Sequence, residues 1–133
     1  MSSNSRKGYA GEHPVELILA QRYGPGVFRP RAGARRDVGD LRGVPLVISC
    51  KNRQVLEIAQ WVDELGPMVE AAGLETGVVW HKRRGQASPL RWYVTTSGEL
   101  FLPLLDAYAE IFHRERASVV SPRKVAHRLP DKQ

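Results

Sequence analysis

The chain has 133 residues, of which 42% are hydrophobic and 26% charged, and it carries a formal net charge of +6 at pH 7. These values are typical of one ordinary globular domain, and no apolar run approaches the roughly 20 residues that a membrane-spanning helix needs. The beginning of the chain lacks the apolar stretch of a signal peptide, and Cys50 is the single cysteine, which excludes an intramolecular disulfide and favours a cytoplasmic location.

The beginning of the sequence predicts a helix, a short strand and a polar loop, in that order. Residues 9–23 place apolar side chains on one side of a helix, and the sequence Gly-Pro-Gly at 24–26 ends it. Val27 begins a run that is typical of a short strand. The Arg- and Gly-rich residues 29–36 are typical of a loop.

The middle of the sequence predicts a buried strand and a broken helix. A turn at residues 43–45 precedes an apolar, β-branched run, which predicts a strand over residues 46–51. Apolar residues at helical spacing then predict a helix over residues 55–72, which Gly66-Pro67 should kink or break.

Two further strands and a last helix are expected in the second half of the chain. Residues 77–80 and 91–95 contain the β-branched and aromatic side chains that strands favour. Thr96 or Ser97 can cap a helix that carries apolar residues on one face. This order of elements predicts an α/β fold with a mixed central sheet of about five strands, flanked by helices.

Basic side chains are concentrated in three parts of the chain, which indicates a polyanionic partner such as nucleic acid. Residues 113–133 hold six Lys or Arg against Glu115 and Asp131, a net charge of +4, and we expect them to form a basic, flexible tail after a domain of residues 1–112. The other two groups are Arg29, Arg31, Arg35 and Arg36, and Lys82, Arg83 and Arg84. A basic surface without a specific ligand is the alternative for each group.

One segment combines the groups that phosphodiester hydrolysis needs, namely oxygen ligands for a divalent cation and a positive charge near the phosphorus. Asp40 comes shortly before the strand predicted over 46–51, which ends in Lys51. Ser49 and Lys51 point to the same face of that strand, because side chains alternate along it. A lysine that ends an apolar strand needs a carboxylate or phosphate partner. The segment therefore predicts a site for a cation and a phosphate.

Three motifs occur in an order that resembles PD-(D/E)xK nucleases, and in particular the Holliday-junction resolvases of archaea and bacteriophages. Lys7-Gly8 followed by Glu12 is similar to their first helix, and residues 35–41 are similar to their Arg- and Gly-rich loop that leads into Gly-Asp. The run 47–52 is similar to their hydrophobic strand ending in (D/E)-x-K. The likeness covers roughly residues 6–110 and implies a restriction-endonuclease-like fold.

The resemblance implies a role for each matched residue. Glu12 and Asp40 are expected to bind Mg²⁺, for which Mn²⁺ can substitute, with the backbone carbonyl of Cys50 as a further oxygen ligand. Lys51 is expected to position the attacking water or to stabilise the transition state. Glu16 is the alternative to Glu12, and Asp37 is the alternative to Asp40.

One position departs from the family pattern, because Ser49 stands where the family has Glu or Asp. A neutral hydroxyl binds Mg²⁺ poorly compared with a carboxylate. Either the site is weak or inactive, or an acid from the following helix replaces the missing one. We prefer Glu64 as the replacement and count it with Ser49 among the catalytic positions, and with the metal ligands. Asp63 and Glu57 are the alternatives.

The resemblance also implies a four-way DNA junction as substrate and a homodimer as the working unit, because two symmetric cuts suit a two-fold protein. We expect phosphate contacts from the basic groups of the domain and from Lys7, Asn52 and Arg53. Three alternatives stay open: a nuclease for flapped or damaged duplex, a non-catalytic DNA-binding module, and a structural or RNA-binding protein in which the motif residues do not meet.

Overall fold

The protein is represented by a computed structural model that describes the backbone of residues 3–30 and 39–118 and the side chains of residues 11–30 and 39–118. The chain forms two compact units, Met1–Phe101 and Leu102–Gln133. The first unit contains the sheet and the described residues of the predicted site. Within the described ranges, no helix is long and apolar enough to cross a membrane.

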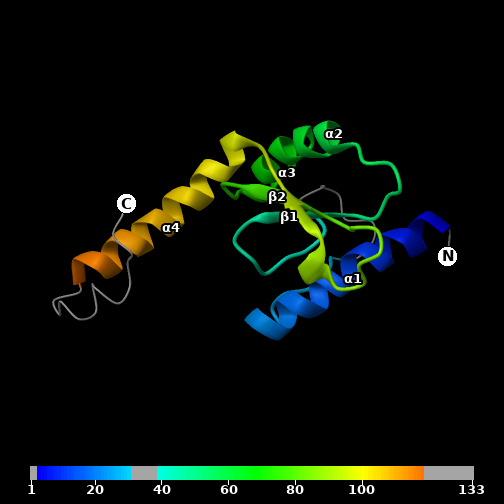
Figure 1. The fold of residues 1–133 in the computed structure, drawn as a ribbon, viewed down its shortest axis with the longest axis horizontal. Coiled ribbons are helices and arrows are strands. Elements are labelled where there is room, and N and C mark those ends of the chain that lie inside the picture. Colours follow the sequence, from blue (N-terminus) through cyan, green and yellow to red (C-terminus); the bar gives the residue numbers. More distant parts are fainter. Residues whose placement is uncertain (1–2, 31–38, 119–133) are drawn as a thin grey trace. The chain divides into compact units, whose positions relative to one another are not determined.

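The described strands form one mixed sheet in the order β1-β2-β3 (Figure 1). Strand β1 (Val47–Lys51) pairs in parallel with β2 (Gly77–His81), which pairs in antiparallel fashion with β3 (Tyr93–Thr95). The predicted mixed α/β class is therefore confirmed. The described part of the chain contains three strands, whereas the sequence predicts about five.

The strand expected from Val27 shortens to a single antiparallel bridge between Phe28 and Arg42. Two backbone hydrogen bonds make this bridge, from Phe28 N to Arg42 O at 3.1 Å and from Arg42 N to Phe28 O at 2.8 Å. Pro30 follows closely and has no N–H to donate, so the ladder cannot continue in that direction. Phe28 and Arg42 are thus joined by an isolated pair of backbone hydrogen bonds and do not belong to a full strand ladder.

Helix α1 (Ser3–Tyr23) begins earlier than the sequence pattern predicts and contains Pro14. It packs against β1 on the opposite side of the sheet from the next two helices (Figure 1). Gly11 permits this close packing, because a Cβ atom added there would lie 3.1 Å from Asn52 Cβ. The contact brings the middle of α1 to the carboxyl end of β1.

The helix predicted over residues 55–72 is divided into α2 (Ile58–Asp63) and α3 (Leu65–Ala72). The break lies at Glu64, slightly before the predicted Gly66-Pro67. Pro67 falls in the first turn of α3, where the missing N–H would have no helical partner in any case. The chain therefore breaks before the proline and keeps it inside the second helix.

The hydrophobic core lies between the sheet and helices α2 and α3. Its buried residues are Val47, Trp61, Leu65, Met68, Val69 and Val79. Since side chains alternate along β1, Ser49 and Lys51 lie on the same face of the strand as Val47. Ser49 is consequently buried, with 2% of its surface exposed, and Lys51 lies at the end of that face.

Helix α4 (Gly98–Ser118) begins where the sequence predicts, with Ser97 as its cap. The Ser97 Oγ accepts a hydrogen bond from Leu100 N at 3.1 Å, and the Thr76 hydroxyl donates to the Leu100 carbonyl. The predicted tail begins inside this helix, because residues 113–118 are helical, and residues 119–133 lie outside the described ranges. The domain boundary at residue 112 stays a prediction.

Candidate active site

Asp40 is held against β1 by hydrogen bonds to its backbone and its side chain. Asp40 N donates to Ile48 O at 2.8 Å, and Cys50 N donates to Asp40 Oδ2 at 2.6 Å. Gly39 has φ +98°, and a Cβ atom there would lie 2.8 Å from a Val47 methyl carbon. A glycine before Asp40 therefore allows the carboxylate to reach the strand.

Glu12 of α1 meets Asp40 at this point. The pKa of Asp40 is raised from 3.8 to about 7, and burial is the largest cause. The charge and the hydrogen bond of Glu12 also raise this pKa, whereas the hydrogen bond from the Cys50 N–H lowers it. Nearby Lys51 lowers the pKa by a smaller amount. Two adjacent carboxyl groups in a partly buried place repel each other when both are ionised. The pair is therefore suited to share a proton or a cation.

Lys51 extends from the end of β1 towards the junction between α2 and α3. Its Nζ lies 3.8 Å from Glu64 Oε1 and 6.0 Å from the centre of the Trp61 ring. The two alternative acids, Asp63 and Glu57, are exposed and make no described ion pair with Lys51. Of the three acids considered from sequence, Glu64 is the one that reaches the lysine.

Ser49 lies on the same face of β1 as Lys51, but it is enclosed, whereas Lys51 is partly exposed. Ser49 is 2% exposed and lies on the face of β1 that packs against α2 and α3. A charged side chain confined there would need compensation for its loss of hydration. The neutral hydroxyl avoids that cost, and Glu64 supplies the negative charge beside Lys51.

Cys50 is buried, as expected for a small hydrophobic residue. Burial raises the pKa of its thiol, and the charges of Asp40 and Glu12 raise it further, so the sulfur is not a nucleophile. The positive charges of Lys51 and Arg29 lower the pKa of the same thiol by a smaller amount. Four charged side chains from separate parts of the sequence therefore surround the end of β1.

Arg29, which the sequence predicts only as a DNA contact, lies beside the carboxylates. Its Nη1 lies 3.2 Å from Glu12 Oε1, and its Nε lies 3.2 Å from Glu16 Oε1. Glu12 and Glu16 are four positions apart on α1, so they share a helix face. That spacing is the sequence signal for a bridging cation. Of the two candidate ligands on α1, Glu12 and Glu16, Glu12 is the acid that contacts Asp40.

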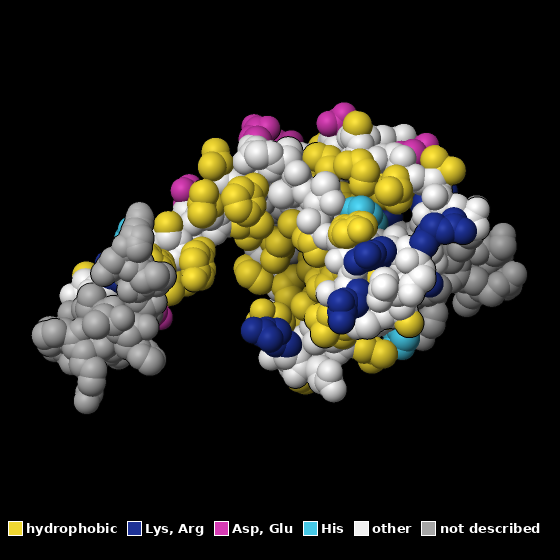
Figure 2. Space-filling view, viewed as in Figure 1, with side chains coloured by type: hydrophobic (Ala, Val, Ile, Leu, Met, Phe, Trp, Pro, Cys, Tyr) yellow, Lys and Arg dark blue, Asp and Glu magenta, His cyan; other side chains and the backbone are white. Residues whose placement is uncertain are grey.

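The remaining predicted DNA contacts are on the surface of this unit or outside the described side chains. Lys82 Nζ lies 5.9 Å from the centre of the Trp92 ring. The guanidinium carbon of Arg83 lies 5.3 Å from the centre of the Tyr93 ring. Arg53 and Arg84 are exposed, and Asn52 lies against α1 at Gly11. Figure 2 shows several Lys and Arg side chains on one face of the molecule. The predictions outside the described side chains are Lys7, Arg31, Arg35, Arg36 and the alternative ligand Asp37.

The donors present suit a cation that needs few protein ligands. Among the described residues there is no group of three or more His, Cys, Asp or Glu arranged to hold a metal ion. Mg²⁺ usually takes one or two carboxylates and completes its shell with water and substrate phosphate. The neighbouring carboxyl groups of Glu12 and Asp40 match that requirement, and a cation beside them would offset the burial and the mutual repulsion that raise the pKa of Asp40.

No known protein family matches the chain, and no curated protein or solved structure matches it either. Its function is therefore inferred from the side chains that meet at the end of β1.

Proposed function

We propose that the chain is a Mg²⁺-dependent DNA endonuclease of the PD-(D/E)xK type that resolves four-way junctions. One observation carries the proposal: Glu12, Asp40 and Lys51, which come from a helix, a loop and a strand, meet at one place. An accidental set of motifs has no reason to converge in this way. The convergence therefore weighs against a structural or RNA-binding protein with chance motifs.

Each residue of the cluster has a role in the proposed reaction. Glu12 and Asp40 would hold Mg²⁺ or Mn²⁺, with the Cys50 carbonyl and Glu64 as further oxygen donors. The ion would supply Lewis-acid stabilisation of charge on the phosphate. Lys51 positions the attacking water or stabilises the negative charge that develops on phosphorus. The 3.8 Å ion pair supports a second role for Glu64, which is to hold the lysine.

The proposal includes a wider context for the domain. We infer that the three described strands are the centre of a restriction-endonuclease-like sheet of about five strands, and that two copies act together on a two-fold junction in the cytoplasm. A nuclease that cuts flapped or damaged duplex is the nearest alternative. Burial of Ser49 favours a second candidate, a DNA-binding module of the same fold with weak or absent cleavage.

Cleavage of a labelled four-way junction tests the proposal directly. Wild-type protein is expected to nick two symmetric strands with Mg²⁺ or Mn²⁺ and to stop when EDTA is added. Linear duplex and flapped duplex of equal length separate a resolvase from other structure-selective nucleases. Tight junction binding without cutting under any metal condition would favour the non-catalytic module instead, and absence of DNA binding would reject both.

Replacing Glu64 by Gln is expected to reduce the cleavage rate by about 10- to 100-fold, a typical cost of removing a group that orients a site. The amide keeps the size of the side chain and loses the ion pair with Lys51. Single-turnover cleavage measures the effect on chemistry apart from DNA binding. The matched controls Asp63→Asn and Glu57→Gln remove one charge each from exposed positions nearby. Equal losses in all three variants would contradict a specific role for Glu64.

A further inference from the structure

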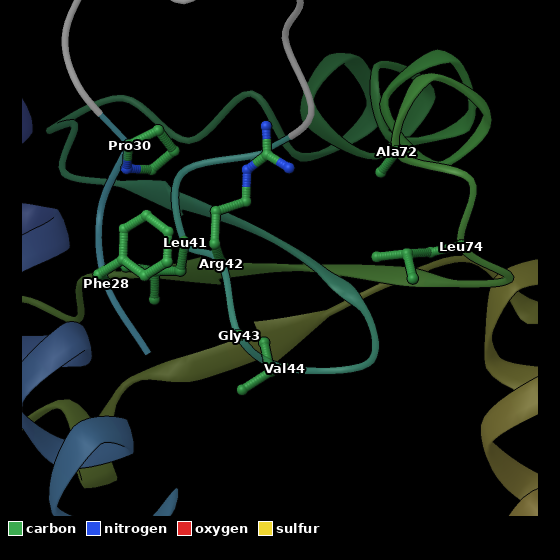
Figure 3. A pocket seen from close by; sticks show the side chains of 8 residues that line it. All are labelled: Phe28, Pro30, Leu41, Arg42, Gly43, Val44, Ala72 and Leu74. Atoms are coloured by element: carbon green, nitrogen blue, oxygen red, sulfur yellow. The ribbon is translucent and has the colours of Figure 1, made fainter. Parts of the chain in front are cut away.

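A pocket of about 490 Å³ lies in the first unit, at the bridge that follows α1. One side is formed by Phe28, Pro30 and Leu41, and the other by Ala72 and Leu74 (Figure 3). Gly43 and Val44 close it at the turn that follows the bridge. The volume lies within the range of small-molecule binding sites.

The described side chains that line the pocket are apolar except for one cation. Arg42 stands between the two sides in Figure 3, and its backbone is fixed by both hydrogen bonds to Phe28. Among the described residues, no acceptor lies within hydrogen-bond distance of the buried Arg42 Nε. A buried donor without a partner is rare in folded proteins and calls for an acceptor from elsewhere. Phe28 is half exposed, at 50%.

These features together define the chemistry of the occupant. Phe28 and the aliphatic side chains suit a flat, weakly polar ring, and Arg42 suits a negatively charged group with several acceptor oxygens. A nucleotide has both parts, since its base stacks on aromatic side chains and its phosphate binds arginine. A purely aliphatic ligand would leave the buried Arg42 Nε without an acceptor among the described residues.

We propose that this pocket holds one unpaired nucleotide, with the base against Phe28 and the phosphate on Arg42. The proposal rests on the proposed function in taking DNA as the partner, because Leu41 and Arg42 directly follow the candidate ligand Asp40. A branch point is where a duplex most readily supplies an unpaired nucleotide. Among the described residues that line the pocket, Arg42 has the one polar side chain, so binding is expected to be insensitive to base identity.

DNA binding in EDTA, where cleavage is absent, tests the pocket separately from catalysis. The probe is a flapped duplex with 2-aminopurine at the unpaired position, compared with fully paired duplex of equal length. Phe28→Ala and Arg42→Gln are each expected to weaken binding of the flapped probe about tenfold and to change 2-aminopurine fluorescence in the complex. Phe28→Ala should leave binding of paired duplex within about threefold of wild type, because stacking needs a free base.

Two controls keep the result interpretable. Arg22→Gln removes the same charge from an exposed position on α1 and should change affinity for the flapped probe by less than about threefold. Leu74→Trp fills the pocket and should act like Phe28→Ala. Thermal unfolding confirms that each variant is folded.

A second experiment distinguishes free nucleotide from nucleotide within a strand. Titration with deoxyadenosine monophosphate, followed by NMR of the Val44 and Leu74 methyl groups, should show saturable shifts that Phe28→Ala removes. Such shifts together with unchanged flap binding in the variants would assign the pocket to free nucleotide. Folded pocket variants that bind both the flapped probe and the mononucleotide as wild type does would overturn the inference and leave the nuclease proposal intact. If the pocket variants lose DNA binding as expected but the wild-type protein does not cut DNA, the pocket inference stands and the nuclease proposal fails.

Discussion

Replacing Asp40 by Asn is expected to reduce DNA cleavage by roughly 1,000-fold and to stabilise the fold at pH 8. The loss follows from the proposed metal site, because a bound cation contributes several kcal/mol of transition-state stabilisation and a neutral amide holds it poorly. The gain follows from the burial that raises the pKa of Asp40 to about 7. An amide oxygen still accepts the hydrogen bond from Cys50 N without placing a charge beside Glu12.

The pH dependence of this stability difference has a definite sign. The unfolded chain releases the Asp40 proton near the ordinary pKa of 3.8, whereas the folded protein keeps it up to about pH 7. The contribution of Asp40 to stability is full below pH 3.8, falls as pH rises between the two values, and is lost above about pH 7. Fully ionised, the buried carboxylate costs on the order of 4 kcal/mol.

Urea unfolding of both proteins without divalent cations, between about pH 4 and pH 8, measures the difference. As pH rises, the free energy of unfolding of Asp40→Asn should increase relative to that of wild type. The free energy of unfolding of Asp63→Asn should show the same pH dependence as that of wild type, because Asp63 is exposed. Mg²⁺ should raise the stability of wild type and leave Asp40→Asn unchanged. A variant less stable than wild type at pH 8 contradicts the buried carboxylate, and a variant that still cleaves contradicts Asp40 as a ligand.

Gly43→Ala is expected to lower the free energy of unfolding by about 3 kcal/mol or more, which is a large fraction of the stability of a small domain. Gly43 has φ +94°, a conformation that other residues adopt at a cost. An added Cβ would also collide with the Gly26 carbonyl group and would lie 2.9 Å from Val27 Cα. Because the collision is with backbone, a side-chain rotation cannot relieve it.

The matched control for this substitution is Gly85→Ala. Gly85 also has a positive φ, +78°, but a Cβ added there meets nothing within 4 Å. It should cost only about 1 kcal/mol, the conformational part of the effect. Thermal or urea unfolding of the two variants therefore isolates the collision. Similar losses in both would show that the turn at Gly43 yields, and that the Phe28–Arg42 bridge does not depend on close approach of the two segments.

Local sequence patterns determined the elements that carry the candidate site. The apolar, β-branched run leading to Lys51 predicts β1, and a cap at Thr96 or Ser97 predicts the start of α4, because strand preference and helix capping depend on neighbouring residues. The same reasoning placed the helix break only approximately. Pro67 is acceptable in the first turn of a new helix, so the break moved to Glu64.

Only the tertiary structure decided which charged side chains meet. Asp63 ends α2 and Glu64 lies at the break before α3, so the way these two helices pack against β1 selects Glu64 as the acid that reaches Lys51. Glu12 meets Asp40 because α1 packs closely at Gly11. The raised pKa of Asp40 likewise depends on burial and on a neighbour distant in sequence, neither of which a local pattern contains.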